Sequence, residues 1–526
     1  MEMKKMFKMA AAAAMVGLMA FAAGCGGGDK KAEKAAVKDT LKMGVTNFAD
    51  SFEPTENYFG WVVMRYGVGE CLTKFDKKMV TSPWLCDKWS VSDDKLTWTF
   101  HINDKATFSN GNKVTGEAVK KSIERTFKMA KRAQSMFQYE SITADGQNVM
   151  IKTKAPIVTL PGMLGDPLFI IVDADASAKI DTRKMGPICT GPYITESFTK
   201  AKFVGVRNEK YWGGEVPFKK LEVPSIDDPN TRAMALQKGE IDVAVNIASG
   251  DMALFRGKDK FTVSEIPSLR VVLSRVNVRP ERVFGDPAVR HAFLKCLDRD
   301  TYAKSLLKGT FYTGGPYMAP STDYGWKELM AEYPDKYDVE GAKKMLDAAG
   351  WKDTDGDGIR EKNGKKLEAD LITYSSRAEL PTYSEAAQAS AKAIGMKINV
   401  KLLDYNVTDK ETREGRYDLS VCNTLTMQAG DAETFMKMYL MTGQEQNGSG
   451  YSNKEFDALG HKLTSEFDPA KRKQIVIDMQ KIIAKDGVGV IFGTPMTNMV
   501  SSKAVTGAEI FPCDYYWFTT DIKPAK

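Results

Sequence analysis

The chain has 526 residues, of which 43% are hydrophobic and 27% charged, a balance typical of a globular protein with two or three domains. Its formal net charge of +6 comes from 74 basic and 68 acidic residues. The basic residues form only short runs, which indicate solvated helix faces, so we exclude nucleic acid as a partner.

The N-terminus predicts export. Lysines at positions 4, 5 and 8 precede a short apolar run that ends in small residues, the pattern of a secretory signal peptide over 1–24. The sequence FAAGC resembles a bacterial lipobox, so we expect a lipid anchor on Cys25, followed by a flexible glycine- and lysine-rich tether over 25–37. The alternative is plain secretion with a chance cysteine. The predicted location is the cell membrane, facing the periplasm or the cell exterior.

The first half of the mature chain alternates strand-like and helix-like segments. At 96–102, Leu, Trp, Phe and Ile alternate with Thr and His, as in a half-buried strand. At 115–130 a threonine cap begins a periodic helix. Further strands are predicted at 41–46, 148–154 and 203–208, and a turn, helix and strand over 228–245.

The second half continues the alternation, which predicts an α/β protein. Helices are predicted within 286–309, at 339–350, at 384–395 and over most of 452–487, and strands at 366–376, 398–405, 417–423 and 488–493. No fixed-period repeat occurs, so solenoids and propellers are excluded.

Six cysteines follow Cys25, and none forms a CxxC pair, so a zinc site or a thioredoxin-like site is not predicted. Export would permit a bridge between Cys71 and Cys86, but buried free thiols are the favoured interpretation.

Five ordered blocks resemble one known family. They begin with SPWLCDKWSVSDDKLTWTFHINDKATFSNGNKVTGEAV, followed by CTGPYITESF with VRNEKYWGG, and they continue over 228–243, 286–320 and 349–368. Together they resemble the solute-binding proteins of bacterial ABC importers, in the large peptide/nickel family, and lie nearest its nickel-type branch.

The resemblance implies a two-lobed periplasmic-binding-protein fold that closes around a ligand. Lobe I would take 38–277 plus 496–526, with an extra subdomain at about 65–190, and lobe II would take 278–495. The crossover strands would lie near 273–279 and 492–498. The implied function is to capture a small polar solute and deliver it to a membrane permease, with the protein acting as a monomer and not as an enzyme.

The ligand is left open between two classes. Members that bind nickel chelates use a histidine in a loop that corresponds to 441–450, and they place arginine in a segment corresponding to 161–170; neither residue type is present there. Peptide-binding members hold the ligand's amino group with an aspartate, where this chain has Gln428. A nickel or other metal chelate is slightly favoured over a di- or oligopeptide, and a sensor with another small ligand is a further alternative.

Candidate ligand contacts come from both lobes, and core packing is the competing interpretation for the aromatic ones. They are Tyr58, Trp61, Phe137, Arg275, Asn277, Thr426, Met427 and Gln428. No metal-ligating residues are predicted, because the three histidines lie far apart on a strand and two helices.

Two motifs suggest other functions and are set aside. The stretch 305–308 fits the SxxK pattern of penicillin-recognising enzymes, but its partner motifs are missing. In KDTDGDGIRE, Asp353, Asp355 and Asp357 match the first ligands of a calcium-binding EF-hand, but position 12 is Gly364 and a strand follows. Structural calcium is therefore not favoured over a turn without an ion, and no cofactor is expected.

Overall fold

The computed structural model describes residues 38–525, which belong to one compact unit. The predicted signal peptide, the lipid anchor at Cys25 and the tether lie outside the described residues. None of the helices within 38–525 is long and apolar enough to cross a membrane.

The strands form one large sheet, a separate four-stranded sheet and three short pairs. Their bounds are β1 Thr40–Gly44, β2 Thr73–Phe75, β3 Thr81–Pro83, β4 Cys86–Val91, β5 Thr97–Ile102, β6 Tyr139–Asp145, β7 Asn148–Thr153, β8 Tyr193–Phe198, β9 Lys202–Arg207, β10 Lys220–Pro224, β11 Val243–Val245, β12 Phe261–Pro267, β13 Arg270–Val276, β14 Phe311–Thr313, β15 Glu361–Lys362, β16 Lys365–Lys366, β17 Glu368–Tyr374, β18 Lys397–Leu403, β19 Leu419–Leu425, β20 Val490–Ser502, β21 Val505–Thr506 and β22 Lys523–Pro524.

The helices cover the sheets and range from single turns to the long α16. Their bounds are α1 Gly60–Arg65, α2 Gly116–Met129, α3 Lys131–Met136, α4 Leu160–Met163, α5 Ala174–Ser177, α6 Thr182–Met185, α7 Pro229–Gln237, α8 Pro287–Cys296, α9 Arg299–Thr301, α10 Trp326–Ala331, α11 Val339–Ala348, α12 Glu379–Lys392, α13 Tyr405–Arg413, α14 Glu433–Leu440, α15 Lys454–Ser465 and α16 Pro469–Asp486.

The α/β prediction is confirmed, and most predicted boundaries lie within a few residues of the observed ones. Thr115 caps α2, its side chain accepting from the Ala118 amide as expected for a helix start. The strand predicted at 96–102 is β5, whose residues alternate between half-buried and buried. The least accurate boundary is the end of β20 at Ser502, nine residues beyond the predicted end at 493, and α12 begins at Glu379, five residues before the predicted start at 384.

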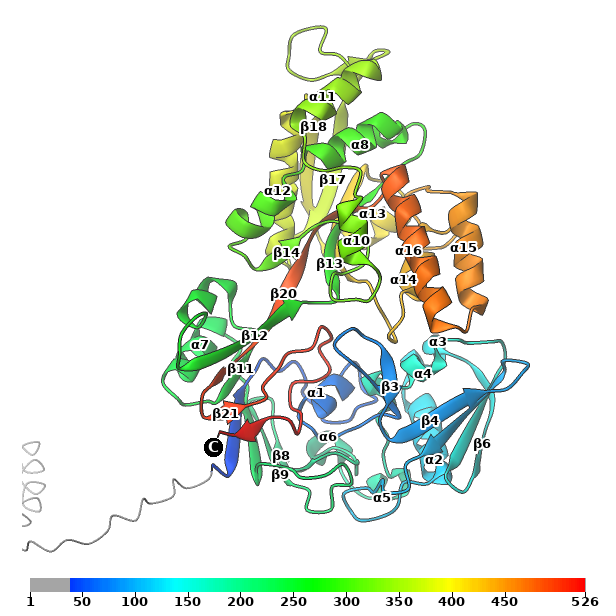
Figure 1. Cartoon of the computed structure of the whole chain (residues 1–526), viewed down its shortest axis with the longest axis vertical. Coiled ribbons are helices and arrows are strands. Elements are labelled where there is room, and N and C mark those ends of the chain that lie inside the picture. Colours follow the sequence, from blue (N-terminus) through cyan, green and yellow to red (C-terminus); the bar gives the residue numbers. More distant parts are fainter. Residues whose placement is uncertain (1–37, 526) are drawn as a thin grey trace, which may run out of the picture. The chain divides into compact units, whose positions relative to one another are not determined.

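Two long strands connect two groups of strands in the large sheet. Its order is β18-β17-β19-β13-β20-β11-β1-β10-β9-β8, so β13 and β20 separate the group β17 to β19 from the group around β1. Figure 1 shows β20 running from one part of the molecule into the other beside β13. These strands overlap the predicted crossovers at 273–279 and 492–498. We use "lobe I" and "lobe II" for the two sides with the predicted boundaries, except that β13 is counted with lobe II because it pairs with β19 along its whole length.

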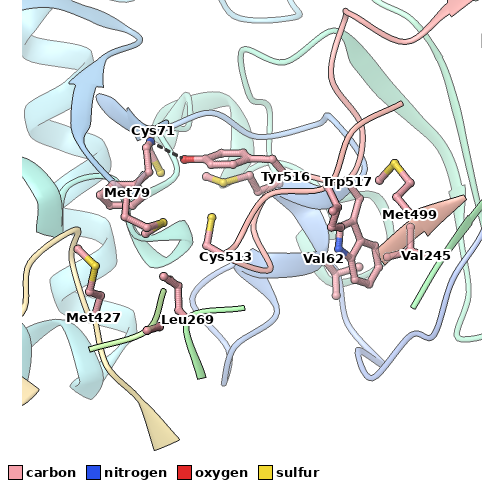
Figure 2. Packing of buried hydrophobic residues seen from close by; sticks show 14 of the residues in the cluster. Val62, Cys71, Met79, Val245, Leu269, Met427, Met499, Cys513, Tyr516 and Trp517 are labelled. Atoms are coloured by element: carbon pink, nitrogen blue, oxygen red, sulfur yellow. Dashed lines mark hydrogen bonds between the residues drawn. The ribbon is translucent and has the colours of Figure 1, made fainter. Parts of the chain in front are cut away.

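The main apolar cluster crosses from lobe I to lobe II. It includes Val62, Met79 and Cys513 on the first side and Met427 on the second, all at most 4% exposed. Figure 2 shows Met427 and Leu269 next to Met79 and Cys513. The four-stranded sheet β4-β5-β7-β6 has its own core with α2, as expected for a separate subdomain.

A buried carboxylate explains two of the motif blocks. Glu70 is 1% exposed and accepts hydrogen bonds from Thr190 Oγ1, Tyr211 Oη and Trp212 Nε1 at 2.7–2.8 Å. Thr190 belongs to CTGPY, and the two aromatic residues belong to RNEKYW. These motifs therefore tie distant segments of lobe I to one side chain, which is a structural role.

The aspartate-rich loop between α11 and β17 has a different acidic set from the predicted one. Carboxylate oxygens of Asp353, Asp355 and Glu361 lie within 4.8 Å of one another. Lys366 pairs with Asp355 at 3.2 Å and also with Asp357. The candidate calcium ligand Asp357 is thus turned toward a lysine, and Glu361 stands in its place. An ion here remains the disfavoured alternative.

Cys71 and Cys86 are both buried free thiols. The interpretation favoured from the sequence is therefore confirmed, and the alternative of a bridge between them is not observed.

Candidate functional site

A groove of about 580 Å³ lies between residues of the two lobes. Its lobe I wall includes Met79, Thr81 and Gly162, and its lobe II wall includes Met427 and Arg472. The lobes approach closely here, because a Cβ atom added to Gly162 would lie 1.8 Å from the carbonyl oxygen of Ala429. Glycine at this position therefore permits contact between the two backbones.

Beside this contact, lobe I carries a group of side chains that we call the aromatic cluster, made of Tyr58, Trp61, Arg132, Asp166 and Tyr515. The Trp61 ring lies edge-on to Tyr58 and to Tyr515, with centroids 5.6 and 5.3 Å apart. The guanidinium of Arg132 lies 4.6 Å from the Tyr58 ring centre, a cation–π arrangement. Its Nη2 donates to Asp166 Oδ1 at 3.1 Å. Rings, cation and carboxylate thus form one connected surface.

The aromatic cluster contains buried donors that have no acceptor. The indole Nε1 of Trp61 and the Nε of Arg132 are both buried and make no hydrogen bond within residues 38–525. Trp517 Nε1 is a third such donor, and its ring lies against Arg65, which in turn contacts Trp61. A buried donor without an acceptor costs about 1–3 kcal/mol. Acceptor oxygens of a ligand would satisfy such donors.

Buried arginines add positive charge near these donors. Arg65 is 5% exposed, and burial lowers its pKa while Asp514 opposes that shift. Arg270, at the start of β13, has a pKa lowered by burial and by the neighbouring Arg377, with Asp514 again opposing. Neither Arg270 nor Arg377 forms an ion pair with any residue of 38–525. An anionic solute would be attracted to this region.

The loop that follows β19 places its three predicted contact residues differently. Thr426 is fully buried, and its hydroxyl donates to the Leu269 carbonyl at 3.0 Å, so it binds the chain itself. Met427 is 4% exposed and lines the groove between the lobes. Gln428 is exposed and pairs through its backbone with Asp431. Of the three, Gln428 alone offers an accessible polar group.

The acidic residues of this loop are already neutralised. Arg472 is 7% exposed at its side chain and donates to Asp431 at 2.8 and 3.1 Å and to Glu433 at 3.1 Å. Lys437 also contacts Glu433 at 3.3 Å. Neither carboxylate is free to hold the ammonium group of a ligand.

Two of the predicted contacts lie at buried positions where they contact other parts of the chain. Phe137 is 4% exposed in the subdomain core, with its ring centre 5.0 Å from that of Phe127. Asn277 is fully buried, and its amide donates to the carbonyls of Gly415 and Tyr417 at 2.9 and 2.8 Å. Asn277 therefore braces the crossover.

The remaining predicted contacts lie at accessible positions. Tyr58 is 51% exposed, and Trp61 is half-buried within the aromatic cluster. Arg275 is half-buried and faces a separate pocket within lobe II.

The three histidines lie outside the site. His101 and His291 pair with Asp87 and Asp335 at 2.9 and 2.8 Å on β5 and α8, and His461 is exposed on α15. Protein histidines therefore do not provide metal ligands at the groove.

Sequence reasoning missed Arg132, Asp166 and Tyr515. The family resemblance directed attention to arginine in the segment 161–170, but the charged residue of that segment is Asp166. Tyr515 is separated from Trp61 by more than 450 residues, and the C-terminal return to lobe I was the one signal that could place them together.

Comparisons with known proteins agree on one class. A family model described as "Bacterial extracellular solute-binding proteins, family 5 Middle" matches residues 81–447. The nickel-binding protein NikA of Staphylococcus aureus is 25% identical over 429 residues, covering 81% of this chain and 82% of the relative. The dipeptide-binding protein DppE of Bacillus subtilis is 25% identical over 499 residues, covering 88% of each chain.

A solved structure shares the fold. The structure described as the nickel ABC transporter from Bacillus halodurans has a TM-score of 0.82 and 23% identity, covering 92% of this chain and all of that one.

Proposed function

This chain belongs to family 5 of the bacterial extracellular solute-binding proteins, and on that premise we propose that it captures a carboxylate-bearing metal chelate between its lobes. Proteins of this family bind nickel chelates and peptides and deliver them to ABC importers in the membrane. The proposal concerns which of these ligand classes the chain takes. It includes no catalytic step, and turnover of a bound solute would contradict it.

The unpaired donors of the aromatic cluster and of the neighbouring Trp517 carry the proposal. Trp61 Nε1, Arg132 Nε and Trp517 Nε1 are buried and lack acceptors among the described residues. Carboxylate oxygens of a chelator would accept from them, and hydrogen bonds to charged groups are worth about 1.5–3 kcal/mol each. The flat faces of Tyr58 and Trp61 would pack against the chelator's carbon skeleton.

The same residues disfavour a peptide. A peptide would bring an ammonium group that needs an unpaired carboxylate in a dry cleft. Asp431 and Glu433 are engaged by Arg472, and Asp166 is engaged by Arg132. A chelate that carries its own complete ligand set has no such need. Since the histidines lie elsewhere, nickel or another metal would enter as cargo already coordinated.

Mass spectrometry of protein purified without refolding tests the proposal. Native and elemental spectra should show a metal and a chelator in equal amounts. A set of peptide masses would instead identify the peptide class. If the protein is purified empty, thermal shifts with metal chelates, free metal and dipeptides decide, since a ligand at 100 times its dissociation constant adds about 2.7 kcal/mol of stability. Stabilisation by dipeptides alone would contradict the proposal.

The proposal also includes a lipid anchor on Cys25, delivery of the solute to a membrane permease, and a monomeric protein. Cys25 would carry two acyl chains, because a single chain binds membranes only marginally. Mass spectrometry of the N-terminal peptide from membrane extracts should show the lipid on Cys25, and Cys25→Ala should release the protein from the membrane. An unmodified, cleaved N-terminus would instead indicate plain secretion.

A further inference from the structure

A second pocket lies wholly within lobe II. It has a volume of about 300 Å³, and every lining residue comes from 275–446. Strand residues Arg275 and Cys422 form its floor, and Tyr374, Tyr405 and Tyr439 are among its walls. None of its lining residues belongs to the aromatic cluster or to the groove between the lobes.

The floor of this pocket carries an arginine without an acidic partner. Arg275 forms no ion pair within residues 38–525, although that part of the chain contains many. The groups that act on it electrostatically are Cys422, Tyr439, Tyr417 and Tyr317, which are neutral in their ordinary protonation states. A charge that is largely removed from water costs several kcal/mol unless an opposite charge accompanies it.

The guanidinium also has an unused donor. Tyr439 covers one face of Arg275, with the guanidinium carbon 4.2 Å from the ring centre. Its Nη1 is buried and has no acceptor within the described chain. Because Tyr439 occupies one face of the guanidinium, a ligand would bind at its planar edge. This edge can donate two parallel hydrogen bonds to one carboxylate.

The other polar groups of the pocket favour a small anion with a donor of its own. Asp409 and Arg413, also in the lining, pair with each other, so their charges compensate. Asn423 Oδ1 is a buried acceptor without a donor, while its amide nitrogen donates to Glu379 at 2.8 Å. A small amino acid would present a carboxylate to Arg275 and an N–H group to Asn423.

We propose that this lobe II pocket binds a small carboxylate, held by Arg275 and completed by a donor to Asn423 Oδ1. The site lies beyond the groove between the lobes, so the proposal does not depend on the identity of the transported solute. Since Arg275 is part of the crossover strand β13, occupancy would place a ligand directly on the connection between the lobes.

The test is thermal unfolding of the mature protein in acetate, in glycine and in sodium chloride of matched ionic strength. Acetate and glycine should raise the midpoint saturably above chloride, and glycine should do so at lower concentration because it adds the donor. Arg275→Gln should abolish both responses. The matched control is Arg416→Gln, which removes an exposed arginine outside the pocket lining and should keep them.

A second measurement covers the case in which Arg275→Gln does not fold. Cys422 lies on the pocket floor and is the one described cysteine that is not fully buried. Acetate and glycine should slow its modification by a small neutral thiol reagent in the wild-type protein. Equal responses in chloride and carboxylate, an undiminished response in Arg275→Gln, or unprotected Cys422 would each overturn the proposal. A response lost in Arg275→Gln with capture of the groove ligand intact would separate the two sites.

Discussion

The buried carboxylate of Glu70 should make the stability of lobe I depend on pH. Burial raises the pKa of Glu70 from 4.5 to about 7, although hydrogen bonds from Tyr211, Trp212 and Thr190 partly oppose the shift. No cation within 38–525 forms an ion pair with it. The folded protein therefore holds a proton on this side chain over a range of pH in which the unfolded chain has lost it.

The direction and size of this pH dependence follow from the difference in bound protons between the folded and the unfolded state. Between pH 4.5 and about 7 the folded state binds more protons than the unfolded state, so stability falls as pH rises through this range. At about 1.4 kcal/mol for each pH unit, the difference between 4.5 and about 7 amounts to about 3 kcal/mol. Below pH 4.5 this penalty is absent, and above about 7 it is complete.

Glu70→Gln tests this value, because glutamine keeps the shape of the neutral carboxyl group and cannot ionise. The free energy of unfolding, measured in urea from acidic to mildly alkaline pH, should fall in the wild type relative to the variant by about 3 kcal/mol. Tyr211 can reverse its hydroxyl to accept from the new amide. The control is Glu215→Gln, which changes an exposed glutamate and should leave the profile unchanged. Parallel profiles for wild type and Glu70→Gln would refute the reasoning.

Three further substitutions address the aromatic cluster, the loop that follows β19 and the contact between the lobes. Trp61→Phe keeps a ring but removes the unpaired indole donor, and should weaken ligand binding measured by calorimetry by about 1–3 kcal/mol; unchanged affinity would exclude the indole as a contact. Arg472→Met leaves Asp431 without its cation and Glu433 with Lys437 alone, and should lower the free energy of unfolding by about 3–5 kcal/mol, whereas a loss below 1 kcal/mol would show that solvent replaces it. Gly162→Ala places a methyl group 1.8 Å from the Ala429 carbonyl oxygen, so it should impair lobe closure and ligand affinity while the unfolding midpoint of the unliganded protein changes little. Gly250→Ala, whose Cβ meets no atom within 4 Å, is its control, and equal affinities in the two variants would argue against closure at this contact.

Local patterns predicted most of the fold, because strand alternation and helix caps are encoded within a few residues. The threonine cap of α2 and the alternation of β5 were read directly from the sequence and are confirmed. The strand order was not accessible in this way, since β13 and β20 are joined by pairing between residues more than 200 positions apart. The family resemblance, and not periodicity, indicated that these strands would be crossovers.

The site was predicted less well than the fold, because its residues also come together from segments that are far apart in the sequence. Tyr58 and Trp61 are adjacent in sequence and could be identified together, whereas their partners Arg132 and Tyr515 come from distant segments. Phe137 illustrates the opposite error, because an aromatic residue next to a helix end fits a core and a pocket equally well until its neighbours are known.

Closure of the lobes requires a ligand that interacts with both of them. To raise the closed state from about 1% to about 99% of the molecules, a ligand must bind the closed state more tightly than the open state by about 5.5 kcal/mol. Hydrogen bonds from Trp61 and Arg132 would form in the open and the closed state alike, because both donors are on lobe I, so a preference for the closed state requires contacts with lobe II as well. Arg270 and Arg377, whose charges oppose each other, are the groups available there for an anion. A solute with carboxylates at two ends would relieve that repulsion in the closed state, whereas a neutral solute of the same size would bind lobe I without closing the protein.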